Sequence, residues 1–139
     1  MNVLITGGTG GIGFAVAEHF GRLGHHVILA DINSSQLDSR QQELTAAGYQ
    51  ASGILLNLME QSSIEACAHA YQIDILINNA SAINLTRTED TPAKRFDLMF
   101  DVNLKGAFLL CQSVLKVFVE KRWCTNASAD TVRGSCKSL

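Results

Sequence analysis

A glycine-rich segment near the N-terminus has the composition of a phosphate-binding turn. Residues 6–13 read Thr-Gly-Gly-Thr-Gly-Gly-Ile-Gly and lie between a short apolar run at 3–5 and an amphipathic pattern at 14–23 that ends at Gly24. Glycines let the backbone turn tightly and approach a pyrophosphate, and the following helix offers free N–H groups at its N-terminus. A strand before such glycines and a helix after them is the context of a dinucleotide-binding site; the alternative is a turn that binds no nucleotide. The residues that we predict to contact a dinucleotide are Gly7, Thr9, Gly10, Ile12 and Gly13.

One acidic residue, Asp31, indicates which dinucleotide would bind. Asp31 ends the next apolar run, 27–30, and follows the glycines by about 20 residues, as a dinucleotide fingerprint requires. A carboxylate there accepts hydrogen bonds from the adenosine ribose and repels a 2′-phosphate, and no Lys or Arg follows before Arg40. We therefore predict NAD rather than NADP as the cofactor, with Asp31 and the neighbouring Ile32 in contact with it. The alternative role of Asp31 is to cap the helix that follows.

Apolar periodicity predicts the elements that position these residues. Short apolar runs alternate with helical patterns, which predicts an α/β domain with a Rossmann-like, doubly wound parallel sheet. Asn33 or Ser34 can cap a helix that ends before Gly48, and Ser62 and Glu65 have the spacing of a capping box. The helix capped by Asn33 or Ser34 runs through Ala47. Further strands are predicted at 53–56 and 73–77, and further helices at 62–71 and from Pro92 to about Glu120, with a bend near Gly106.

Four motifs together resemble those of the short-chain dehydrogenase/reductase family. They are the T-G-x-x-x-G-x-G turn at 6–13, the acidic position at Asp31, the D-x-L-x-N-N-A-G strand at 73–80 and the N-x-x-G helix signature at 102–106. The resemblance covers residues 1–122. The spacing of Gly7, Gly10 and Gly13 also fits the extended branch of the family, whereas Asn-Asn-Ala at 78–80 favours the ordinary, non-extended branch.

The resemblance implies an activity and further cofactor contacts. Members of the family transfer hydride between a nicotinamide cofactor and a small alcohol or carbonyl substrate. The matching positions put Asn79 and Ala80 beside the adenosine and ribose, and Ser81 stands where the family has a glycine. Asn57 and Leu58 fall where the family has an aspartate that accepts a hydrogen bond from adenine, a contact that an amide makes more weakly. A turn role at the end of the strand is the alternative for Asn57.

The catalytic Ser, Tyr and Lys of the family are only partly matched. In the family the tyrosine is the general acid/base, the lysine four residues later lowers its pKa, and the serine polarises the substrate. Neither Tyr49 nor Tyr71 begins a Tyr-x-x-x-Lys, and Ser128, or Ala129 in its place, is the candidate for the serine position. Asn103 matches the asparagine whose backbone carbonyl, at a helix irregularity, holds a water on the proton path; a structural hydrogen bond is the alternative.

These matches predict a C-terminally truncated member whose sheet is incomplete at its C-terminal side. Residues 1–122 form the cofactor-binding domain, and residues 123–139 are expected to be poorly ordered or a remnant of the fifth strand. The alternative to an NAD-dependent oxidoreductase is an inactive remnant that binds nucleotide or other subunits. Because the family packs the helix at 104–119 against another subunit, a homo-oligomer is expected.

Composition and charge exclude other classes of protein. With 139 residues, 47% of them hydrophobic, and a net charge of −2, we expect one soluble domain that does not bind nucleic acid. The four cysteines are far apart, and His25 and His26 have no partner at metal-ligand spacing, so no metal site is expected. We expect no signal peptide from the N-terminal residues. Polar residues interrupt the apolar stretch at 107–119, which we interpret as a buried helix and not a membrane span. A cytoplasmic protein with reduced thiols follows.

Overall fold

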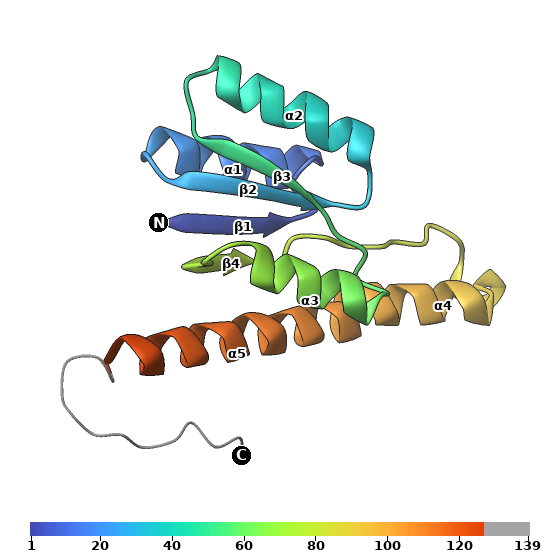
Figure 1. Ribbon diagram of the computed structural model, residues 1–139. Helices are drawn as coiled ribbons and strands as arrows, with labels where there is room; N and C mark the ends of the chain where they lie inside the picture. The colour runs from blue at the N-terminus through green and yellow to red at the C-terminus, as the bar shows by residue number, and fades with distance from the viewer. Residues whose placement is uncertain (127–139) are drawn as a thin grey trace.

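The chain forms a parallel sheet with helices on both faces (Figure 1). A computed structural model describes residues 1–126, with side-chain environments for residues 1–119. The strands pair in the order β3-β2-β1-β4, and every pairing is parallel. Their bounds are β1 (Asn2–Thr6), β2 (His26–Asp31), β3 (Ala51–Leu55) and β4 (Ile75–Ile77). The predicted α/β fold with a doubly wound parallel sheet is therefore confirmed.

Successive residues of a strand pack against different helices. Val3 and Ile5 of β1 pack with α1 (Gly11–Arg22) and α2 (Ser34–Ala46), whereas Leu4 packs with α3 (Gln61–Ala70) and α5 (Ala107–Asn126). All three side chains are fully buried. A parallel strand that is covered on both faces needs an uninterrupted apolar run, which explains the sequence of β1 and β2.

The strand order reverses at β1. β2 pairs with one edge of β1 and β4 with the other, so the chain leaves β1 toward one side of the sheet and later returns on the opposite side. Ligands of open α/β sheets bind at the carboxyl ends of the strands at such a point. The fold thus brings the glycine-rich turn after β1 next to Asn78 and Asn79, which follow β4.

Several helix ends lie where the sequence predicts them. Asn33 is the N-cap of α2, and its Oδ1 accepts a hydrogen bond from Gln36 N at 3.2 Å. Gly24 and Gly48 follow α1 and α2 with φ angles of +79° and +86°. Left-handed backbone of this kind is the usual place for glycine after a helix. Local sequence signals therefore determine both ends of α2.

The predicted capping box at Ser62 and Glu65 is wrong. α3 begins at Gln61, so Ser62 lies inside the first turn and cannot cap it. Glu65 Oε1 instead accepts a hydrogen bond from Gln61 Nε2 at 2.8 Å. The serine that acts at this end is Ser63, whose Oγ accepts a hydrogen bond from Asn57 N at 2.9 Å. That bond joins the first turn of α3 to the start of the loop after β3.

A π-helical turn joins the last two helices into one long run. α4 (Ala93–Phe100) continues through η2 (Asp101–Gly106) into α5, so the irregularity predicted near Gly106 is present. Gly106 is buried, and a Cβ on it would lie 2.5 Å from the carbonyl oxygen of Leu58. α5 extends to Asn126, so residues 123–126 are helical where a poorly ordered segment or a remnant of the fifth strand was expected. The rest of that expected segment, 127–139, lies outside the described residues.

The expectation that 107–119 would be a buried helix is wrong for most of its surface. Among the described side chains of the run from α4 to α5, Gly106, Leu110 and Val117 are buried. Ala93–Val119 is a continuous helix of 27 residues that is long and apolar enough to cross a membrane, judged by length and composition alone, and 17% of an apolar 18-residue stretch within it is buried. The apolar helix is longer than the stretch 107–119 because the π turn joins α4 to α5. One side of the run packs on α3 (Figure 1), and the other is an exposed apolar face.

Substitution of Gly106 by Ala tests the close contact between η2 and the loop after β3. The new methyl group would meet the Leu58 carbonyl oxygen, and we expect the free energy of unfolding to fall by about 1–3 kcal/mol. Urea unfolding followed by circular dichroism measures this change. Gly11→Ala is the control, because a Cβ on Gly11 meets no atom within 4 Å. A Gly106→Ala protein as stable as the parent would contradict the contact.

Candidate functional site

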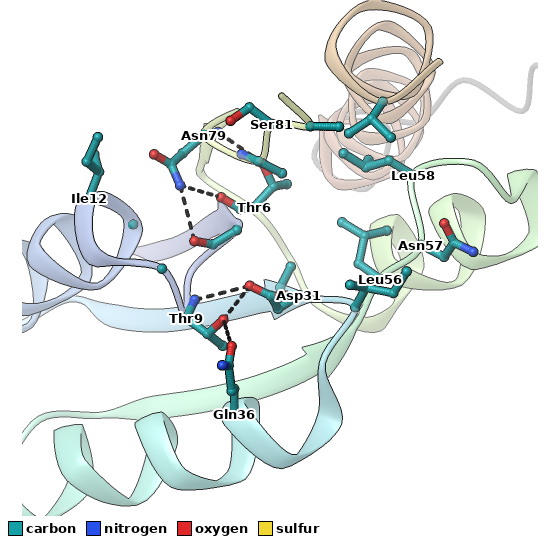
Figure 2. Close-up of a pocket in the computed structure, with 18 of the residues that line it drawn as sticks. Thr6, Thr9, Ile12, Asp31, Gln36, Leu56, Asn57, Leu58, Asn79 and Ser81 are labelled. Atoms are coloured by element: carbon teal, nitrogen blue, oxygen red, sulfur yellow. Dashed lines mark hydrogen bonds between the residues drawn. The ribbon is translucent and has the colours of Figure 1, made fainter. Parts of the chain in front are cut away.

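A cleft of about 600 Å³ lies at the carboxyl edge of the sheet (Figure 2). Its walls come from the glycine-rich turn, the ends of β2 and β3, the loop after β4, and the run formed by α4 and η2. The predicted cofactor contacts that line it are Gly7, Thr9, Gly10, Ile12, Gly13, Asp31, Ile32, Asn57, Leu58, Asn79 and Ala80. The fold therefore brings all of these predicted residues to one cavity.

Two glycines are required by the turn itself. Gly7 has a φ of +62°, and a Cβ on it would lie 2.9 Å from the Cα of Ala80. A Cβ on Gly13 would lie 2.3 Å from the carbonyl oxygen of Gly7. Neither position accepts a side chain, because both neighbours are backbone atoms. Gly7 and Gly13 thus hold the turn against the start of α1 and the loop after β4.

Gly11 differs because the surrounding protein does not require a glycine there. It lines the cleft, and a Cβ on it would meet no atom within 4 Å. The first turn of α1 has no side-chain cap on Gly10 and no acidic residue. Unpaired N–H groups at such a terminus, with the partial positive charge of the helix, form a site for an anion. The space beside Gly11 gives a phosphate group room to approach this terminus.

Thr6 and Asn79 fasten the turn to the loop after β4 (Figure 2). Thr6 Oγ1 accepts hydrogen bonds from Asn79 N and Ala80 N, both at 3.0 Å. In return Asn79 Nδ2 donates to the carbonyl oxygens of Thr6 at 3.0 Å and Gly7 at 3.2 Å. Thr6 is 1% exposed, so these polar groups depend on one another and not on water. The backbone N–H and the Nδ2 group of Asn79 are therefore occupied, and Oδ1 is the remaining polar atom of its side chain.

Asp31 is the one charged side chain among the described residues that line the cleft. Its Oδ2 accepts hydrogen bonds from Thr9 Oγ1 at 2.6 Å and Thr9 N at 3.3 Å, and its Oδ1 accepts from Asn33 N at 3.3 Å. Asn33, and not Asp31, caps α2, so the alternative role of Asp31 as that cap is wrong. The carboxylate is held by both oxygens at the wall of the cleft.

Arg40, the first basic residue after Asp31, does not line the cleft. Its guanidinium carbon lies 4.3 Å from the centre of the Phe14 ring, and Nη1 lies 2.8 Å from Glu43 Oε2. These contacts hold Arg40 between α1 and α2. No Lys or Arg is among the described residues that line the cleft. A 2′-phosphate on the adenosine ribose would therefore have no side-chain cation to pair with there.

Asn57 has the turn role that sequence analysis left as an alternative. Its Oδ1 accepts a hydrogen bond from Met59 N at 3.0 Å, and its Nδ2 donates to Glu60 Oε1 at 2.9 Å. The side chain points away from Asp31 in Figure 2. The apolar neighbours Leu56 and Leu58 are buried and line the cleft. At this wall the cleft is therefore mainly apolar, and a contact between Asn57 and adenine stays a prediction.

Asn103 lies in η2 and ties the helical run to the loop after β4. Its Oδ1 accepts a hydrogen bond from Ala82 N at 2.7 Å, and its Nδ2 donates to Ala82 O at 2.9 Å. This is the structural hydrogen bonding considered as an alternative for Asn103, and the predicted helix irregularity is at the same place. Its place on a proton path stays a prediction, and Ser128 lies outside the described residues.

The two thiols described have different environments. Cys67 is a fully buried residue of α3, and burial raises the pKa of its thiol to about 11. It is therefore protonated at neutral pH. Cys111 lies in α5, and its Sγ is 3.2 Å from Asn78 Nδ2. No group of three His, Cys, Asp or Glu side chains suited to a metal ion is found in the described part of the chain.

Several residues that line the cleft were not predicted from the sequence. Gly11 could have been found, because it is the second glycine of the T-G-x-x-x-G-x-G pattern. Leu98 and Val102 could not, because their position depends on how closely the helical run approaches Leu58. The lining residues that were not selected are Thr6, Gly11, Ala30, Gln36, Leu56, Met59, Ser81, Ala82, Leu98 and Val102.

Comparison with protein families and curated proteins gives consistent matches. The family model described as "short chain dehydrogenase" matches residues 1–125. The human protein "Hydroxysteroid dehydrogenase-like protein 2" is 34% identical over 125 residues, which cover 81% of this chain and 30% of that protein. "Sorbitol dehydrogenase" of Cereibacter sphaeroides is 33% identical over 121 residues, which cover 84% of this chain and 46% of that protein. The chain thus spans between about a third and a half of the length of these relatives.

Solved structures share the fold. A variant of actinorhodin polyketide ketoreductase, solved with NADPH, has a TM-score of 0.79 at 29% identity and covers 83% of this chain and 46% of its own. A citronellol catabolism dehydrogenase from Pseudomonas aeruginosa PAO1 has a TM-score of 0.76 at 26% identity and covers 84% of this chain and 49% of its own. The sheet and its covering helices are therefore arranged as in these enzymes.

The Thr6 hydroxyl gives a direct test of how the cleft is held together. Thr6→Val keeps the shape of the side chain but leaves Asn79 N and Ala80 N without their acceptor. We expect the free energy of unfolding to fall by about 1–3 kcal/mol, measured by urea titration. Thr6→Ser retains the oxygen and should lose much less stability. A Thr6→Val chain that loses no more stability than Thr6→Ser would contradict the hydrogen-bonding role.

Proposed function

This chain belongs to the short-chain dehydrogenase/reductase family, and we propose that its cleft binds NAD(H) for hydride transfer between the cofactor and an alcohol or carbonyl substrate. The observation that carries the proposal is the convergence of the glycine-rich turn, the open N-terminus of α1 and Asp31 on one cavity. The nicotinamide cofactor supplies or accepts the hydride when bound. The residues of this chain bind and orient it.

The chemistry of each wall fits one part of a dinucleotide. The N–H groups at the start of α1, beside Gly11, would hold the pyrophosphate. Asp31 would accept hydrogen bonds from the adenosine ribose, and the apolar wall at Leu56 and Leu58 would contact adenine. Asn79 keeps the turn in place by donating to its carbonyl oxygens. These assignments follow from the donor, acceptor or apolar character of each wall.

NAD is favoured over NADP in this proposal. A 2′-phosphate would lie near the carboxylate of Asp31, and no Lys or Arg among the described lining residues would compensate its charge. Arg40, the nearest basic residue in the sequence after Asp31, is engaged by Phe14 and Glu43. The electrostatics of the cleft thus support the unphosphorylated cofactor.

A second form of the proposal is that this chain by itself binds cofactor without turnover. The sequence has no Tyr-x-x-x-Lys. Tyr49 packs against Gly21, and the Tyr71 ring is 6.0 Å from the ring of His26. Both tyrosines lie at the amino edge of the sheet, beside the starts of β2 and β3, whereas the cleft is at the carboxyl edge. Neither can serve as a general acid/base in the cleft.

Titration of the 139-residue chain with NADH and NADPH tests the proposal. We expect NADH to bind more tightly, and we expect no alcohol oxidation at the roughly 10 s⁻¹ typical of enzymes. Asp31→Ser should weaken NADH binding about tenfold or more, because a charge-assisted hydrogen bond is lost. The ratio of the Kd for NADPH to the Kd for NADH should therefore fall. Cofactor fluorescence measures binding, and absorbance at the nicotinamide band measures turnover.

Asp38→Ser is the matched control for that titration. Asp38 is an exposed residue of α2 that does not line the cleft, so its removal changes the net charge by the same amount. Both affinities should stay within about twofold of the parent. Tighter binding of NADPH than of NADH by the parent would contradict the cofactor assignment, and turnover at ordinary enzyme rates would contradict the second form.

We also propose that the exposed face of the helical run binds a second copy of the chain. The apolar residues there recur at intervals of four and are between 53% and 63% exposed; they are Phe96, Phe100, Leu104 and Phe108. The rings of Phe96 and Phe100 stack at 5.8 Å. A continuous apolar patch of this kind is unfavourable in water and is typical of an interaction surface. Self-association would bury it.

Size-exclusion chromatography with light scattering tests this association. The parent should elute as a dimer or larger at micromolar concentration, and Phe100→Glu should shift it toward the monomer because a charge would be buried in the interface. Leu85→Glu is the control, since Leu85 is 90% exposed and lies outside that helix. A parent chain that stays monomeric at these concentrations would refute the proposal.

A further inference from the structure

Three side chains form a hydrogen-bonded series at the acidic end of the cleft. Thr9 Oγ1 lies 2.6 Å from Asp31 Oδ2 and 3.1 Å from Oε1 of the Gln36 carboxamide (Figure 2). All three residues line the cleft, and Thr9 is 6% exposed. Gln36 is placed there by the first turn of α2, where its N–H donates to the cap, Asn33. The helix that follows Asp31 thus brings a second polar side chain beside it.

The number of available protons decides the direction of these hydrogen bonds. A threonine hydroxyl has one proton to donate. Its contact with the Asp31 carboxylate is the shorter one and is charge-assisted, so the proton points toward Asp31. Gln36 must then present its amide N–H to the Thr9 oxygen. A rotation of the carboxamide by half a turn about the Cγ–Cδ bond exchanges Oε1 and Nε2 and achieves this without moving the rest of the side chain. The donors run from Gln36 to Thr9 to Asp31, and each strengthens the next.

We propose that Gln36 is a positioning residue that increases the selectivity of the cleft for NAD over NADP, a role that rests on the proposed binding of NAD(H). Its amide fixes the rotation of the Thr9 hydroxyl, which in turn satisfies Asp31 Oδ2. Asn33 N donates to Oδ1 at 3.3 Å, so both carboxylate oxygens are held. The lone pairs that remain on them are oriented for the hydroxyl groups of a ribose.

A ribose and a 2′-phosphate respond differently to this arrangement. Ribose hydroxyls donate to a fixed carboxylate, whereas a 2′-phosphate is an anion with acceptor oxygens only. Loss of Gln36 leaves the Thr9 hydroxyl free to rotate and Asp31 less firmly held. NADH therefore loses affinity, whereas NADPH, whose 2′-phosphate the carboxylate repels, changes less. The selectivity falls although Asp31 is still present.

Gln36→Met tests the role of the amide at nearly constant side-chain length. In fluorescence titrations of the 139-residue chain, we expect the Kd for NADH to rise about three- to tenfold and the Kd for NADPH to change less than twofold. Gln42→Met is the matched control, because Gln42 is an exposed glutamine of the same helix outside the cleft. Its two Kd values should equal those of the parent. The urea midpoint of Gln36→Met should stay at the parent value.

Thr9 makes the test specific to the hydrogen-bonded series. If Gln36 acts through Thr9, Gln36→Met has no further effect on selectivity in a Thr9→Val chain, whereas Thr9→Ser keeps the full response to it. Additive losses in the double variant would overturn the proposal. A parent chain that binds neither cofactor overturns the proposed function and this inference with it. Binding of NADH by the parent, with an unchanged NADH-to-NADPH ratio in Gln36→Met, overturns this inference alone.

Discussion

The buried hydroxyl of Thr6 is the interaction on which the rest of the site depends. It stands at the last residue of β1 and accepts the backbone N–H groups of Asn79 and Ala80, which follow β4. Because β1 and β4 are neighbours at the point where the strand order reverses, this oxygen joins the two sides of the cleft. Asn79 completes the connection by donating to Gly7, whose left-handed backbone starts the turn into α1.

The remaining walls are attached to this centre by close backbone contacts and paired polar groups. Gly106 allows η2 to approach Leu58, and Asn103 binds both backbone groups of Ala82, so the helical run is held against two loops of the cleft. At the opposite end, Thr9 extends the turn to Asp31. The same helical run that lines the cleft exposes an apolar face on its other side, which is the face proposed to bind a second copy of the chain.

Local signals in the sequence predicted the sheet, the glycine-rich turn and the residues along the cleft. Asp31 and the glycines follow short-range rules of strand ends and turns, and they lie where those rules place them. Features that depend on approach between distant segments were missed or wrong: the role of Thr6 requires β4 beside it, and the exposed face of 107–119 depends on which elements cover it. The prediction of a capping box at Ser62 was wrong because the helix begins one residue earlier, at Gln61. At this end of α3 the serine that binds the preceding loop is Ser63 and not Ser62.

The central claim is that the cavity at the carboxyl edge of the sheet holds the cofactor. A ¹⁵N–¹H correlation spectrum of the chain titrated with NADH tests it residue by residue. The account predicts that the largest shifts fall on the amides of Gly10, Gly11, Ile12, Asp31 and Ala80, which line the cleft. Shifts concentrated instead on the outer face of α1, at Ala15 and His19, or an unchanged spectrum at millimolar NADH, would contradict it.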